Sequence, residues 1–135
     1  MKKNLNENPA SQNKGIFQNK LKILLIEDDP TMRSLLKTLL TLEGFQVDLF
    51  ESMDKDIIRS IQNEKPDVLI MDIHLRTHNG IDITRSIRLH PDLKELKIII
   101  TSGMDQASES LSAGANNFLL KPYMPDELIR ILKMK

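Results

Sequence analysis

The chain has no cysteine among its 135 residues. Disulfide bonds, thiolate metal sites and thiol nucleophiles are therefore excluded. The sequence also lacks an apolar run near the ~20 residues that a membrane-spanning helix needs. Lys2 and Lys3 are not followed by the apolar core of a secretory signal. Because a cysteine-free chain is compatible with a reducing compartment, we expect a soluble cytoplasmic protein with no membrane partner.

An excess of charge is missing as well. Lys plus Arg and Asp plus Glu each number 19, so the formal net charge is zero. This balance does not favour direct binding to nucleic acid or to an anionic membrane. The clear local imbalance is acidic and lies at Glu27-Asp28-Asp29.

The first twenty residues differ from the rest in composition. They are rich in Asn, Lys and Gln, and among them only Leu5, Ile16 and Phe17 are large and apolar. Such a segment buries too little surface to offset its ordering entropy. We therefore predict a mobile tail over residues 1–20 and one domain over residues 21–135, with a docking role for Ile16 and Phe17 as the alternative.

From residue 20 onward, short apolar runs alternate with segments of helical periodicity. Strands are predicted near 21–27, 45–50, 67–72, 97–101 and 116–120. Helices are predicted near 30–44, 57–65, 80–90, 105–113 and from 125 to the end. Five such units joined by right-handed crossovers predict a doubly wound α/β fold. We expect a five-stranded parallel sheet of order 2-1-3-4-5 in a flavodoxin-like three-layer sandwich, with no apolar segment left for a second domain.

Charged or hydroxyl residues follow four of the five strands. Glu27 and Asp28 follow the first, Asp72 ends the third, Thr101 the fourth, and Lys121 follows the fifth. The carboxyl ends of parallel strands line one edge of a sheet, and the first and third strands are neighbours roughly 4.8 Å apart. Carboxylates crowded together there require neutralisation, and Mg²⁺ is the hard cation suited to a phosphate site.

The same residues suggest phosphoryl chemistry. A carboxylate such as Asp72 can attack a phosphoryl group to form an acyl phosphate, and Lys121 and Thr101 could hold its oxygens. Each residue also has a plain structural interpretation, as a helix cap before Pro30, a solvated lysine or an ordinary strand threonine. Their shared position on one edge favours a functional site.

The four segments, taken in order, resemble the receiver domain of two-component response regulators, in particular the stand-alone regulators of chemotaxis. The matching segments are 23–30, 72–80, 100–102 and 113–122, and the resemblance covers about residues 20–135. It implies that Asp72 is the phosphoacceptor. It also implies that Mg²⁺, or alternatively Mn²⁺, is held by Glu27, Asp28, Asp72 and the backbone carbonyl of His74.

The resemblance further implies a phosphorylation-driven switch. Thr101 and Lys121 would bind the phosphoryl group, and the Lys121–Pro122 peptide bond would be cis. Thr101 and the aromatic ring of Phe118 would change packing together when Asp72 is phosphorylated. Apart from its own phosphorylation and dephosphorylation, such a protein is not an enzyme.

Partners follow from the same resemblance. A histidine kinase or histidine phosphotransfer protein would donate the phosphoryl group, docking on the first helix at Met32 and Leu35 and on the loop after the fifth strand. The read-out surface for a downstream protein would comprise the helix at 105–113, the fifth strand and the last helix. The helix at 105–113 has no Lys or Arg, so we expect a monomer without the salt-bridged dimer of DNA-binding relatives.

Arg76 stands where the family usually has proline, four residues after the acceptor, which makes the rigidity of that loop uncertain. Two alternatives stay open: an interaction module that works without phosphorylation, and the receiver fragment of a larger regulator. A haloacid-dehalogenase-type phosphatase would need Asp-x-Asp after the first strand, whereas the acids here are contiguous, so this class of enzyme is disfavoured. In a flavodoxin-like flavin binder the three acids would repel the flavin phosphate.

Overall fold

The computed structural model describes residues 20–50 and 56–134. The elements, in chain order, are β1 (Lys22–Ile26), α2 (Pro30–Leu42), β2 (Gln46–Leu49), α3 (Ile57–Glu64), β3 (Val68–Asp72), α4 (Gly80–Arg88), the 3₁₀ turn η1 (Pro91–Leu93), β4 (Lys97–Ser102), α5 (Ala107–Ser112), β5 (Asn117–Leu120) and α6 (Pro125–Lys133). The tail predicted for residues 1–20 falls, except for Lys20, outside the described residues.

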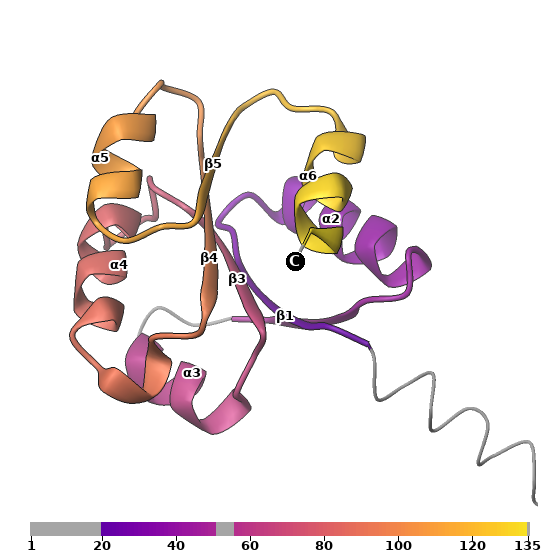
Figure 1. Cartoon of the computed structure of the whole chain (residues 1–135). Helices are drawn as coiled ribbons and strands as arrows, with labels where there is room; N and C mark the ends of the chain where they lie inside the picture. The colour runs from indigo at the N-terminus through magenta and orange to yellow at the C-terminus, as the bar shows by residue number, and fades with distance from the viewer. Residues whose placement is uncertain (1–19, 51–55, 135) are drawn as a thin grey trace, which may run out of the picture.

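The sheet has the predicted topology. Its five strands are parallel and follow the order β2-β1-β3-β4-β5. The helices α3, α4 and α5 cover one face and α2 and α6 cover the other (Figure 1). The doubly wound three-layer sandwich is therefore confirmed, and β1 and β3 are neighbours at the point where the strand order reverses.

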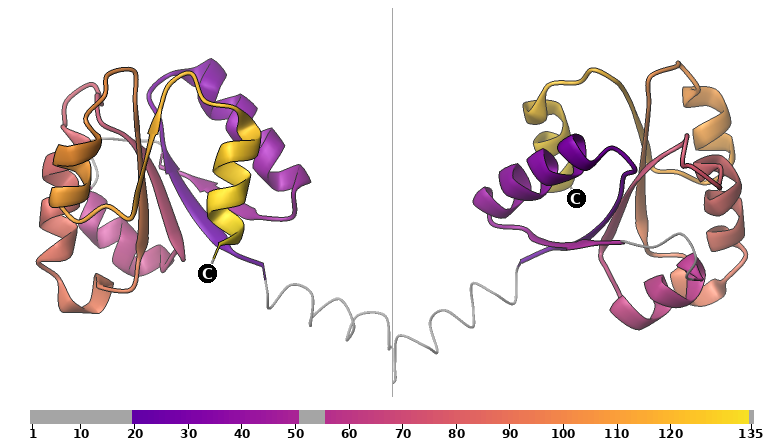
Figure 2. Two further views of the ribbon diagram at one scale, coloured as in Figure 1. Left: turned by 45° about the horizontal axis from the view of Figure 1, so that its top comes forward. Right: turned by 180° about the vertical axis from the view of Figure 1, so that it is seen from behind.

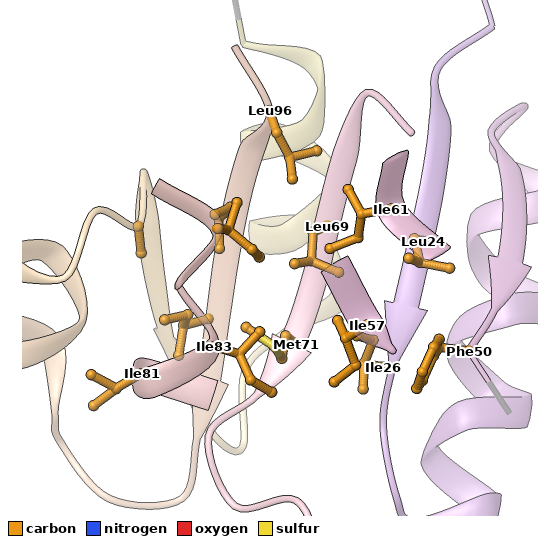
Figure 3. Close-up of a cluster of buried hydrophobic side chains, with 14 of the residues drawn as sticks. Leu24, Ile26, Phe50, Ile57, Ile61, Leu69, Met71, Ile81, Ile83 and Leu96 are labelled. Carbon is orange, nitrogen blue, oxygen red and sulfur yellow. The ribbon is translucent and has the colours of Figure 1, made fainter. Parts of the chain in front are cut away.

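Two cores form because side chains alternate between the faces of each strand. On the side of α3, α4 and α5, strand residues such as Leu24, Leu69 and Met71 pack with Ile57, Ile61 and Ile83 (Figure 3). On the other side, Leu25, Ile70 and Ile99 pack against α2 and α6. Both faces of the sheet are covered (Figure 2), which explains why the strands read as continuous apolar runs.

Helix α2 begins as its sequence predicts. Asp29 is the N-cap and accepts hydrogen bonds from the backbone N–H groups of Thr31 and Met32, with Pro30 as the first helical residue. The leucines of this helix are not all covered: Leu36 and Leu40 are buried against the sheet, whereas Leu35 is 50% exposed.

Two details differ from the predicted boundaries. Helix α5 begins at Ala107 and not near 105, because the Asp105 carboxylate accepts the Ala107 N–H and holds a turn there. The 3₁₀ turn η1 was not anticipated. It is held by Arg88, whose guanidinium donates to the carbonyl oxygens of Leu93, Leu96 and Gly114.

Burial lowers the pKa of Arg88, which has these carbonyls as partners in place of a carboxylate.

Along the described ranges, no helix has the length and apolar character required to cross a membrane.

Candidate active site at the carboxyl edge of the sheet

Four of the predicted site residues leave the sheet on the same side. Leu25, Ile70, Ile99 and Leu119 belong to the core cluster under α2 and α6. Because strand side chains alternate, the residues two positions further on continue on that side. Those residues are Glu27, Asp72, Thr101 and Lys121. Their position on one edge is therefore a direct consequence of strand register.

The Lys121 ammonium joins two of the carboxylates. Its Nζ atom lies 3.0 Å from Asp72 Oδ2 and 3.1 Å from Glu27 Oε1. Burial alone would lower the pKa of Lys121, but the hydrogen bonds and charges of Asp72 and Glu27 outweigh it and raise the pKa. The stabilisation from this pairing is therefore complete at neutral pH and is lost only as the pH rises through the raised pKa.

Glu27 is the most buried of the acids, at 5% exposed. Its second carboxylate oxygen accepts the backbone N–H of Asp29 at 3.1 Å. Its backbone carbonyl accepts from the Arg33 guanidinium at 3.0 Å. These contacts hold the turn between β1 and α2, so the Glu27 carboxylate is fixed in place before any ligand binds.

Asp28 has a different orientation. Its carboxylate oxygen Oδ2 accepts the backbone N–H of Arg76, in the loop between β3 and α4. Sequence reasoning did not identify this contact. The sequence offers one signal for this contact: residue 76 is not proline, so it keeps a backbone N–H that can donate.

Asp72 lies opposite Thr101 in the β3–β4 ladder. Its oxygen Oδ1 accepts the His74 N–H at 3.2 Å, and Oδ2 faces Lys121. His74 pairs with Asn79 in a single antiparallel bridge, whose hydrogen bonds run from Gly80 N–H to Ile73 and from Leu75 N–H to the carbonyl of residue 78. The bridge therefore leaves the His74 carbonyl unused.

The donor set suits a hard divalent cation, since it consists of carboxylate and carbonyl oxygens. One cation of the chain itself already lies in the pocket, the Lys121 ammonium between Asp72 and Glu27. Within residues 20–50 and 56–134, however, no three acidic, histidine or cysteine side chains are arranged ready to hold a metal ion. The residues fit Mg²⁺ in kind, and one carboxylate oxygen of Asp28 is bound to the Arg76 N–H in this structure.

The proposed switch residues lie on different sides of the sheet. Thr101 is buried beside Leu119 in the β4–β5 ladder. Phe118 lies opposite Ile100 and packs, partly buried, against the core under α3, α4 and α5. The Lys121–Pro122 peptide bond is cis, as predicted.

An apolar groove lies next to the acidic pocket. It has a volume of about 460 Å³ and runs between α2 and the segment that follows β5. Its walls are formed by Met32, Leu35, Leu36, Leu39, Lys121, Pro122, Tyr123 and Pro125. Met32 and Leu35, predicted as docking residues, are therefore both at this groove.

Comparison with known families gives one match over most of the chain. Residues 23–133 match the family described as the response regulator receiver domain. The chain is 31% identical over 115 residues to the chemotaxis protein CheY of Thermotoga maritima, which covers 82% of this chain and 93% of that protein. Several transcriptional regulators match as well, and the chain spans about half the length of each.

Solved structures show the same fold. A putative response regulator from Chloroflexus aurantiacus superposes with a TM-score of 0.77 at 30% identity, over 85% of this chain and 96% of that one. The receiver domain of the sensor histidine kinase PA1611 from Pseudomonas aeruginosa superposes with a TM-score of 0.73 at 31% identity, over 84% and 94% of the two chains. That structure has a magnesium ion coordinated in its active-site cleft.

Proposed function

Because the chain belongs to the response regulator receiver domain family, we propose that it is a phosphorylation-switched signalling protein whose phosphoacceptor is Asp72. Receiver domains are signalling modules of two-component systems and not classical enzymes. The observation that carries the proposal is the Lys121 ammonium held between Asp72 and Glu27, with Thr101 opposite Asp72 in the β3–β4 ladder. This arrangement provides a nucleophile, a cation and a hydroxyl on one edge.

In this proposal, each residue has a defined task. A carboxylate oxygen of Asp72 attacks phosphorus, and the bond from phosphorus to the donor's imidazole nitrogen breaks. The imidazole leaves with the electron pair and is protonated. Lys121 and Thr101 bind the phosphoryl oxygens, and Lys121 moves from Glu27 to do so.

Glu27, Asp28, Asp72 and the carbonyl of His74 would hold Mg²⁺, or alternatively Mn²⁺. The bound cation would neutralise the charge that the carboxylates and the phosphoryl group bring together. The magnesium in the PA1611 receiver domain, which is 31% identical to this chain, supports this assignment.

The output surface would comprise α5, β5 and α6. Exposed apolar side chains lie on or next to these elements, namely Met104, Leu111, Leu120 and Met124. A change in packing of Thr101 and Phe118 would alter this surface, and a downstream protein would bind it. We infer a cytoplasmic monomer that acts through protein partners and not by binding nucleic acid.

The phosphoryl donor would be a histidine kinase or a histidine phosphotransfer protein. It would dock in the groove between α2 and the segment after β5, because this groove is the apolar surface adjoining Asp72 and Lys121. A donor bound there brings its phosphohistidine to the acidic edge.

One specific observation favours a second candidate. Since the chain spans about half the length of several relatives, it could equally serve as the receiver part of a larger regulator. An interaction module without phosphorylation is the remaining alternative, and the same experiment separates it from the main proposal.

The test is incubation with acetyl phosphate and Mg²⁺, followed by intact mass measurement. We expect one added phosphoryl group on the wild-type chain and on Asp82→Asn, a control at an exposed aspartate of α4. We expect none on Asp72→Asn or in EDTA. Equal labelling of Asp72→Asn would contradict the assignment of the acceptor, and no labelling of the wild type would favour the interaction module.

A further inference from the structure

All three acids of the pocket already have partners within the chain. Glu27 and Asp72 share the Lys121 ammonium. Asp28 instead accepts the backbone N–H of Arg76, 48 residues away in sequence. The pocket acids therefore have partners of two kinds, a side-chain cation for Glu27 and Asp72 and an uncharged backbone donor for Asp28.

The segment that supplies this donor is a compact loop. Between β3 and α4, Gly80 N–H donates to the Ile73 carbonyl at 2.8 Å, and Leu75 N–H donates to the His78 carbonyl at 3.2 Å. Leu75 is buried in the core under α3 and α4, whereas the side chain of Arg76 is exposed. The base of the loop is thus anchored by packing, and its tip is held to the turn between β1 and α2 by the contact with Asp28.

This contact and cation binding make opposing demands on Asp28. With Asp28 turned toward Arg76, the described residues contain no ready metal-binding group of three ligands. The Arg76 N–H and a cation bound at Asp28 would draw on the charge of the same carboxylate, whose oxygen Oδ2 the N–H already occupies. The position of the loop tip and the occupancy of the acidic pocket would then depend on each other.

We propose that the Asp28–Arg76 hydrogen bond is a latch that closes the β3–α4 loop onto the acidic pocket and opens when Asp28 turns to a divalent cation. The inference rests on the proposed function, since it takes Asp28 as a metal ligand. It adds that Arg76 competes with the cation through its backbone N–H, and so weakens cation affinity. An N–H that merely oriented Asp28 toward the metal would strengthen affinity.

A matched pair of variants can show whether the Arg76 N–H weakens or strengthens the affinity for Mg²⁺. Arg76→Pro removes the N–H, whereas Arg76→Ala keeps it, and both lack the guanidinium charge. By titration calorimetry with Mg²⁺ alone, we expect Arg76→Pro to bind roughly tenfold more tightly than Arg76→Ala, in line with the loss of a competing charge-assisted hydrogen bond.

A second measurement uses the unmodified chain, so that it is independent of any effect of proline on the loop. The hydrogen exchange rate of the Arg76 amide, followed by NMR, should increase when Mg²⁺ is added. If Mg²⁺ binds but this rate is unchanged, or if Arg76→Pro binds Mg²⁺ no more tightly than Arg76→Ala, the latch is wrong and the proposed function stands. If the wild-type chain does not bind Mg²⁺, both are wrong.

Discussion

At the scale of single residues, Tyr123 combines a buried hydroxyl with a place beside the candidate active site. The hydroxyl has no hydrogen-bond partner among the described residues. Burial raises the pKa of Tyr123 to about 12; Lys121 opposes this increase, and Glu27 and Asp72 add to it. The folded state therefore favours the neutral form of Tyr123 more than the unfolded state does. The stability that this preference gives is complete below pH ~10 and is lost as the pH rises through about 12.

This shift can be observed directly, because Tyr123 is the single tyrosine of the chain and there is no tryptophan. In metal-free buffer, absorbance titration should give a midpoint near 12 for the folded protein and near 10 for the urea-unfolded protein. Tyr123→Phe should leave the free energy of unfolding at pH 7 unchanged or slightly raised, because the hydroxyl it removes has no described partner. A folded midpoint near 10, or a loss above about 1 kcal/mol in Tyr123→Phe, would disagree with this environment.

At the scale of elements, the start of α4 is packed tightly onto the end of β3. A Cβ atom on Gly80 would lie 2.7 Å from the Asp72 carbonyl oxygen and 3.0 Å from Ile73 Cα. Both are backbone atoms, so they cannot move aside as a flexible side chain would. Gly80 therefore allows α4 to approach the backbone of Asp72, the proposed phosphoacceptor.

Gly80→Ala should destabilise the protein by roughly 1–3 kcal/mol through this overlap, although alanine is the better helix former by ~1 kcal/mol. Gly103→Ala is the matched control, since a Cβ there meets no atom within 4 Å. Its stability should stay within about 0.5 kcal/mol of the wild type. Urea unfolding followed by far-UV circular dichroism measures both, and equal stability of the two variants would refute the packing argument.

At the scale of the whole molecule, the groove beside the active site joins elements far apart in sequence. Leu35 from α2, Pro122 from the segment after β5 and Pro125 at the start of α6 line it together. Leu35 is 50% exposed and lies at this groove. An apolar surface of this kind is typical of a binding site.

We predict that Leu35→Glu slows phosphoryl transfer from a donor protein by roughly tenfold or more, without changing labelling by acetyl phosphate, which needs no docking. Leu42→Glu is the control, because Leu42 is on the same helix, is 78% exposed and is not among the residues that line the groove. The donor in this assay is a phosphorylated histidine phosphotransfer protein that labels the wild-type chain. Equal slowing by both variants would show that the groove is not the docking surface.

Much of this molecule could be predicted from local patterns. Buried parallel strands read as apolar runs such as 68–71, Pro30 and Asp29 mark a helix start, and the strand-end positions of Asp72 and Lys121 follow from register. These features depend on near neighbours in sequence and on side-chain alternation, which a sequence displays directly. The resemblance of four ordered segments to a known family added the roles of individual residues.

Other features depend on contacts between distant segments. No pattern near Asp28 shows that its carboxylate meets the backbone of Arg76, and no property of Leu35 distinguishes it from the buried Leu36. Alternation and periodicity specify which residues face the sheet, whereas the pairing of donors and the width of a groove arise only when loops converge in space. The order of residues along the chain thus defines the acidic edge for which we propose phosphoryl transfer, and the tertiary structure decides which partner each carboxylate binds.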